Sequence, residues 1–219
     1  MDPEAGRKRM LADLDMEVRL TRDHTGRDAL DPRVLEAVAK VPRHRFVPAG
    51  LEERAYDNGP LPMGHGQTIS QPFMVALMSD LLQVGPEATV LEVGTGSGYQ
   101  AAVLAELVRQ VYSIEVVPEL AEAAEARLQG LGYRNVETRL GDGYAGWPEH
   151  APYDGIIVTA AATEVPPALV EQLKPGARLV IPVGSPYWGQ DLRVIEKDAD
   201  GGSHSRSVLP VAFVPLVHR

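Results

Sequence analysis

Apolar and polar residues alternate along the chain with two different periods, which predict helices and strands in turn from residue 89 onward. Helical spacing predicts helices over 99–108, 118–130 and 165–176, and the second begins at Pro118 and ends at Gly130. Short apolar runs predict strands over 89–93, 111–115, 135–140, 153–159, 177–184, 191–197 and 207–216. Because helices separate most of these strands, the pattern predicts an α/β fold with a mixed, mostly parallel sheet and helices on both faces.

Two further patterns complete the predicted organisation. An Asp-Gly-Gly turn at 200–202 joins the last two strands as a C-terminal antiparallel hairpin. Before residue 89, helices are predicted over 3–20, 32–40 and 72–82. A long irregular stretch lies between the second and the third of them. We therefore expect residues 1–88 to form a helical extension that carries a substrate or active-site loop. It should pack on a core of residues 89–219, as one structural unit.

The composition narrows the classes of function. The 219 residues are 44% hydrophobic, carry a net charge of −9 and include no cysteine. Because no basic run is interleaved with aromatic residues, nucleic acid is not an expected partner. The chain has neither a signal-peptide pattern nor an apolar run that could span a membrane, so we expect a cytoplasmic protein without a membrane partner, acting as a monomer. Six scattered histidines and the lack of cysteine argue against a metal site.

The stretch VLEVGTGSG at 90–98 is the strongest candidate for a binding site. An apolar strand leads into three glycines at alternate positions, and a helix follows at once. The spacing G-x-G-x-G is tighter than that of dinucleotide-binding folds, and Glu92 would repel a pyrophosphate. A tight turn without a ligand is the alternative. We predict that the following residues bind a ligand with a cationic group, such as S-adenosylmethionine: Glu92, Gly94, Thr95, Gly96 and Gly98.

Two more acidic residues end predicted strands. Glu115 closes the second strand, and Asp142 with Gly143 follows the third. In an open α/β sheet, ligands bind beyond the carboxyl ends of the strands. We therefore predict that Glu115 accepts hydrogen bonds from ribose hydroxyl groups and that Asp142 accepts one from an adenine amino group. Solvated loop carboxylates are the alternative for both.

The loop GHGQTISQP at 64–72 gathers polar side chains before a predicted helix. Ser70 is expected to be the N-cap of that helix, and a helix N-terminus with a free hydroxyl group suits a carboxylate ligand. Ser70 is not expected to be a hydrolase nucleophile, because no G-x-S-x-G elbow surrounds it.

Motifs along the whole chain resemble one family. They are VPRHRFVP at 41–48, GHGQTISQP at 64–72, VLEVGTGSGYQAA at 90–102, VYSIE at 111–115, LGDG at 140–143, YDGIIVTAAA at 153–162, LKPGARLVIPVG at 173–184 and SVLPVAFVPL at 207–216. On these residues the chain resembles the bacterial type of protein-L-isoaspartate (D-aspartate) O-methyltransferase, a repair enzyme with a Rossmann-like fold.

The resemblance implies a function and a site. S-adenosylmethionine would donate a methyl group to the free carboxylate of isoaspartyl residues in damaged proteins and leave as S-adenosylhomocysteine. The methyl ester would then collapse to a succinimide, part of which hydrolyses to normal aspartate. Ser70 would be the catalytic residue, and the segment of Thr68, Ile69 and Ser70 would lie near the cofactor. Because the carboxylate is already ionised, neither a base nor a metal is required.

The chain also offers candidate substrate contacts and departs from the family pattern at a few positions. Candidate substrate-binding residues are His65, Gln67, Ala160, Ala161, Val214 and Leu216. Phe73 stands where many relatives have tyrosine. The segment 20–30 looks long, and the tail after 216 looks short, which puts a contact over the cofactor in doubt.

Three other functions are weighed against this one. A methyltransferase of the same fold could act on a small molecule or on another peptide carboxylate. A nicotinamide-dependent reductase would need a wider glycine spacing and a catalytic Tyr or Lys near the fourth strand. A non-catalytic binding module would be expected to lack Glu115 or the glycine turn.

Overall fold

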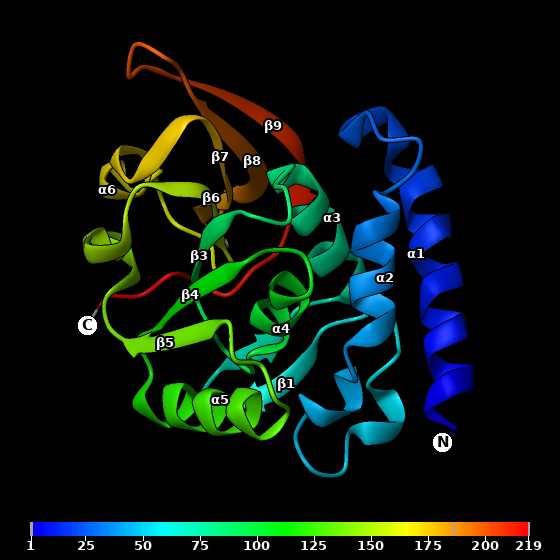
Figure 1. The fold of residues 1–219 in the computed structure, drawn as a ribbon. Coiled ribbons are helices and arrows are strands. Elements are labelled where there is room, and N and C mark those ends of the chain that lie inside the picture. Colours follow the sequence, from blue (N-terminus) through cyan, green and yellow to red (C-terminus); the bar gives the residue numbers. More distant parts are fainter. Residues whose placement is uncertain (1, 186, 219) are drawn as a thin grey trace.

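A mixed β-sheet forms the centre of the protein (Figure 1). The structure is a computed structural model that describes residues 2–185 and 187–218, and within them seven strands pair in the order β5-β4-β3-β6-β7-β8-β9. Their bounds are β3 (Thr89–Val93), β4 (Gln110–Glu115), β5 (Val136–Leu140), β6 (Tyr153–Val158), β7 (Leu173–Ser185), β8 (Gly189–Lys197) and β9 (Ser203–Val211). Strands β3 to β7 are parallel, and β8 and β9 run antiparallel, as the sequence predicted.

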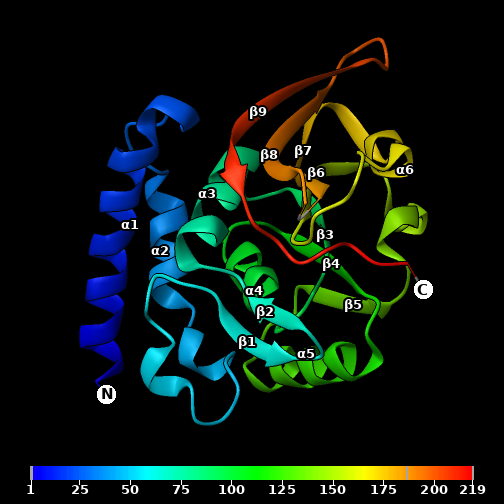
Figure 2. The same cartoon turned by 180° about the vertical axis from the view of Figure 1, so that it is seen from behind.

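Helices cover the two faces of the sheet unequally (Figures 1 and 2). One face carries α3 (Pro72–Leu82), α4 (Tyr99–Ala105) and α5 (Pro118–Gly130), with α1 (Pro3–Thr25) and α2 (Pro32–Lys40) packed outside them. The other face carries α6 (Pro167–Glu171) and the short 3-10 helices η3 (Gly143–Ala145) and η4 (Pro148–His150). The prediction of helices on both faces is therefore confirmed.

Strand alternation divides the buried apolar residues between two cores. Val90 faces the helices α3 and α4, whereas its neighbours Leu91 and Val93 face the other side. The first core also takes in Met10 and Leu14 of α1. Residues on both sides of position 88 thus share one packed interior.

Several predicted boundaries are wrong. Helix α1 continues to Thr25, beyond the predicted end at residue 20, and ends at Gly26 with φ +66°. Helix α6 stops at Glu171, because the chain already pairs with β6 from Leu173. Strand β9 ends at Val211 and does not reach 216. Ser70 is not the N-cap of α3; that position is Gln71, whose side chain makes no capping hydrogen bond.

The stretch before α3 is more regular than expected. It contains the 3-10 helices η1 (Arg43–Arg45) and η2 (Glu52–Arg54) and an antiparallel hairpin of β1 (Leu61–Gly64) and β2 (Gln67–Ile69). His65 lies at the hairpin turn with φ +54°, between two glycines that also have positive φ. The hairpin projects over the glycine turn, so that Met63 approaches within 3.1 Å of the position of a Cβ added at Gly96.

The tail 212–218 crosses the carboxyl ends of the strands (Figure 2). The backbone nitrogen of Ala161 donates to the carbonyl of Val214 at 2.8 Å, and that of Leu216 donates back to Ala161 at 2.8 Å. His218 stacks on Tyr144 at 3.9 Å between ring centroids. The short tail therefore does reach over this edge of the sheet. None of the described helices is long and apolar enough to cross a membrane.

Candidate active site

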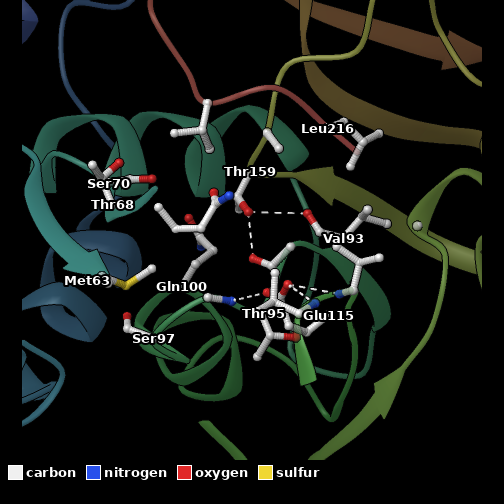
Figure 3. Close-up of a pocket in the computed structure, with 18 of the residues that line it drawn as sticks. Met63, Thr68, Ser70, Val93, Thr95, Ser97, Gln100, Glu115, Thr159 and Leu216 are labelled. Atoms are coloured by element: carbon white, nitrogen blue, oxygen red, sulfur yellow. Dashed lines mark hydrogen bonds between the residues drawn. The ribbon is translucent and has the colours of Figure 1, made fainter. Parts of the chain in front are cut away.

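One cavity lies where the strand order reverses, beyond the carboxyl ends of β3, β4 and β6 (Figure 3). We call it the main cavity because most of the predicted site residues line it. Such a switch point is where open α/β sheets bind ligands, because the loops diverge there. Four main segments line it: 67–70 after the hairpin turn, the glycine turn 94–97, the end of β4 at 114–117, and the tail at 214–217. Ser70 and Thr68 lie on one side and Glu115 on the other (Figure 3).

Gly94 lets the backbone of the glycine turn lie close against the end of β6. A Cβ atom at this position would lie 2.4 Å from Thr159 Oγ1, and φ is +98°. The Thr159 hydroxyl group donates to the Gly94 carbonyl oxygen at 2.6 Å, which fixes the turn against the end of β6. Only glycine fits both the conformation and the space.

Glu115 carries the negative charge of the cavity. Its Oε2 accepts from the backbone nitrogen of Gly96 at 2.7 Å, and its Oε1 accepts from Val116 at 2.9 Å and Val117 at 3.0 Å. These three donors hold the carboxylate rigidly at the cavity wall. No Lys or Arg occurs among the described lining residues, so the cavity favours a cationic ligand.

Glu92 does not face the cavity. Its side chain is fully buried beside β4, where the Ser113 hydroxyl group donates to Oε2. Thr95 Oγ1 lies 2.6 Å from Ser113 Oγ and extends this chain of hydrogen bonds to the glycine turn. Burial raises the pKa of Glu92 to about 8 despite the Ser113 hydrogen bond. The expectation that its charge attracts a cationic ligand is therefore wrong, because the carboxyl group is mostly neutral at pH 7.

Ser70 owes its position to a buried cation. The Arg43 guanidinium group, fully buried, donates through Nη2 to the Ser70 carbonyl oxygen at 2.7 Å and through Nε to Ala55 at 2.7 Å. It also lies 4.6 Å from the ring centroid of Tyr99. Among the described residues, none forms a hydrogen bond with Ser70 Oγ, so this hydroxyl group is free to meet a ligand.

Asp142 lies at the edge of the cavity but is engaged elsewhere. Its Oδ1 accepts from the backbone nitrogen of Tyr144 at 2.9 Å, and its Oδ2 lies 3.0 Å from Nδ1 of His218 in the tail. Gly143 beside it does line the cavity. A Cβ atom at Gly143 would lie 2.3 Å from Val93, so this position admits glycine alone.

The structure brings most of the residues predicted from the sequence to one cavity. Those that line it are Gln67, Thr68, Ile69, Ser70, Gly94, Thr95, Gly96, Glu115, Gly143, Ala160, Val214 and Leu216. Those that do not are His65, Glu92, Gly98, Asp142 and Ala161. Gly98 instead packs against α5, where a Cβ atom would lie 3.2 Å from Leu128. Ala161 pairs with the tail through its backbone.

Sequence reasoning missed two lining residues that Figure 3 labels, Gln100 and Thr159. Met63, which also lines the cavity, was expected only as part of the loop 59–70, a candidate wall of the substrate site. Thr159 could have been found, because it directly follows the buried run that forms β6 and so stands at the carboxyl edge of the sheet. Gln100 carried no such signal.

Comparisons with known proteins agree with this geometry. A family model described as protein-L-isoaspartate(D-aspartate) O-methyltransferase matches residues 20–219. The chain is 60% identical over 212 residues to protein-L-isoaspartate O-methyltransferase 2 of Syntrophobacter fumaroxidans, covering 97% of this chain and 86% of that protein. The chain belongs to the protein-L-isoaspartate O-methyltransferase family. An enzyme of the same name from Polaromonas is 60% identical over 207 residues, covering 94% and 98%.

Solved structures of isoaspartate methyltransferases have the same fold. One protein-L-isoaspartate O-methyltransferase matches with a TM-score of 0.83 at 28% identity, over 95% of this chain, which spans 65% of that protein. A Plasmodium falciparum homologue in complex with S-adenosyl-L-homocysteine matches with a TM-score of 0.76 at 24% identity, covering 94% and 98%. Our chain is thus an S-adenosylmethionine-dependent methyltransferase of this family. The described residues include no group of three or more His, Asp or Glu arranged to hold a metal ion.

Proposed function

We propose that this isoaspartate methyltransferase transfers a methyl group from S-adenosylmethionine to the free α-carboxylate of L-isoaspartyl residues, with Ser70 as the residue that orients that carboxylate. The observation that carries the proposal is the position of Ser70. Its free hydroxyl group stands in the same cavity as Glu115 and also opens onto a second cavity toward α1. One side chain can therefore meet both the cofactor and the substrate.

The residues of the main cavity fit S-adenosylmethionine. Glycines at 94 and 96 let the backbone approach a ligand closely, and the fixed carboxylate of Glu115 suits ribose hydroxyl groups. The single negative charge and the lack of lining cations suit a molecule with ammonium and sulfonium groups. Gly143 and the neighbouring tail residues, Leu216 among them, offer a close apolar surface for the rest of the ligand. When bound, the cofactor supplies an electrophilic methyl group.

The protein's own contribution is alignment. The substrate carboxylate is an ionised nucleophile at neutral pH, so no side chain has to remove a proton. Ser70 would donate a hydrogen bond to one carboxylate oxygen and leave the other directed at the methyl group. Arg43 behind Ser70 fixes the backbone that carries this hydroxyl group. Alignment of two reactants can lower a barrier by roughly 7–11 kcal/mol in favourable cases.

Methyl transfer to matched peptides tests this function. We would incubate the purified protein with S-adenosylmethionine and either an isoaspartyl peptide or the same peptide with normal aspartate. Release of S-adenosylhomocysteine with the first peptide and background release with the second is the expected result. Equal rates with both peptides, or transfer only to small carboxylic acids, would point instead to another methyltransferase of the same fold.

A further inference from the structure

A second cavity of about 530 Å³ adjoins the main one and opens between α1 and the end of β9. The two cavities share Thr68, Ser70, Thr159 and Val214, so a substrate with its carboxylate at Ser70 would extend into this second space. Helix α1 packs against both α3 and β9, which bound the cavity on either side (Figure 2). We call this space the α1 groove.

Glu17 is the one charged residue among those described that line the α1 groove. Most of the other lining side chains are apolar, such as Phe73 and Phe213. Glu17 is half-buried, and no described Lys, Arg or His side chain forms an ion pair with it. Its partners are two neutral amides at long distances, Asn58 Nδ2 at 3.4 Å and Gln71 Nε2 at 3.5 Å. The carboxylate therefore stands in a mostly apolar groove without a cationic partner among the described residues.

Glu17 is also close enough to the reacting position for a substrate side chain to reach it. Gln71, which contacts it, directly follows Ser70 in the chain. An extended peptide advances about 3.3–3.6 Å per residue, so a residue two positions from the isoaspartyl group would lie about 7 Å further along the groove. A lysine or arginine side chain at such a position can reach Glu17.

We propose that Glu17 is a specificity-determining residue that favours isoaspartyl segments with a lysine or arginine near the isoaspartyl residue. The inference rests on the proposed function and refines its substrate class. Glu17 lies outside the part of the chain that the family model matches, which begins at residue 20.

The test compares three isoaspartyl peptides that differ only in one residue, which is Lys, Gln or Glu. One set of three carries this residue next to the isoaspartyl group, and a second set carries it two positions away. An ion pair with this partly exposed carboxylate should give a preference of about two- to fivefold in kcat/KM for the Lys peptide over the Gln peptide. The preference should shrink as the salt concentration rises. The variant Glu17→Gln should equalise the two peptides, and Glu17→Lys should favour the Glu peptide.

Asp15→Asn provides the matched control. Asp15 lies on the same helix but pairs with Arg19 at 2.7 Å on the exposed surface, so its loss removes one charge without touching the groove. This variant should keep the wild-type preference. The inference is overturned if Glu17→Gln keeps the Lys preference, or if Asp15→Asn loses it equally. Both of these results concern only the preference among peptides, and the proposed function stands as long as the wild type methylates isoaspartyl peptides. If the wild type methylates none of them, the proposed function is overturned as well.

Discussion

The guanidinium group of Arg43 donates a hydrogen bond to the backbone carbonyl of Ser70 at 2.7 Å, across 27 positions of sequence. Arg43 is fully buried and also holds the carbonyl of Ala55. One buried side chain thus connects the first 3-10 helix to the segment that carries the proposed catalytic hydroxyl group. Arg43 is a positioning residue for Ser70.

Replacement of Arg43 by leucine should therefore affect both stability and activity. Two buried carbonyl groups would lose their partner, which costs roughly 2–5 kcal/mol in the free energy of unfolding. Urea unfolding measures this loss, and methyl transfer well below the midpoint should still be slower than in the wild type. Arg45→Leu is the matched control, because Arg45 is exposed in the same short helix. Normal turnover by folded Arg43→Leu would contradict the positioning role.

Ser70→Ala should lower turnover without affecting cofactor binding, whereas Glu115→Ala should weaken cofactor binding. Loss of the Ser70 hydroxyl group removes one hydrogen bond to an anionic substrate, so kcat should fall about 10- to 100-fold while calorimetry finds S-adenosylmethionine bound as in the wild type. Loss of the Glu115 carboxylate should weaken cofactor binding about tenfold or more. Full activity in Ser70→Ala would rule out its proposed role.

Gly94→Ala should damage the cofactor site for two separate reasons. The new Cβ atom would meet Thr159 Oγ1 at 2.4 Å, and a φ of +98° costs an L-residue about 1–3 kcal/mol. We expect a lower midpoint of thermal unfolding and at least about tenfold weaker cofactor binding. The double variant with Thr159→Ala removes the clash but not the strain, so it should recover part of the loss.

Gly85→Ala is the control for Gly94→Ala and for its double variant with Thr159→Ala. Gly85 has no heavy atom within 4 Å of an added Cβ, and its φ is not positive. Its substitution should leave both the unfolding temperature and the cofactor affinity within error. Equal damage from Gly85→Ala and Gly94→Ala would mean that the close contact with Thr159 is not the cause.

Glu92 should make stability depend on pH. Its pKa is raised to about 8 in the folded protein by burial, from an ordinary value of 4.5. Between these values the folded state keeps a proton that the unfolded state loses, so stability falls as pH rises, by at most about 1.4 kcal/mol per pH unit. Glu92→Gln removes this dependence.

The measurement is urea unfolding of the wild type and Glu92→Gln at fixed ionic strength between pH 5 and pH 8. The stability of the variant relative to the wild type should increase steadily across that range. A constant difference would mean that Glu92 does not hold its proton in the folded state.

The sequence predicted the fold well where local signals were strong. Helices α3 and α5 have the predicted bounds because a proline at the first helical position begins each of them. The hairpin of β1 and β2 escaped prediction because its strands are only four and three residues long. Such short strands depend on tertiary packing more than on their own pattern.

The site was predictable where backbone geometry dictates the residue. The glycine turn and Glu115 were found because their spacing follows from a strand, a turn and a helix N-terminus. Glu92 was misplaced because the side of a strand on which a residue lies depends on the alternation of its neighbours. Val90 and Glu92 share one face, and Leu91 and Val93 share the other. The contact of the tail with Ala161 and Asp142 joins distant segments and left no trace in local sequence.

The course of the tail has a practical consequence for producing the protein. Residues 214 to 217 line the cavity, and His218 is tied to Asp142 at its rim. An affinity tag fused behind this segment would begin beside the mouth of the cavity and would disturb the contact of His218. A tag placed ahead of α1 avoids this, because the start of α1 and the tail 214–218 lie on opposite sides of the molecule (Figure 1).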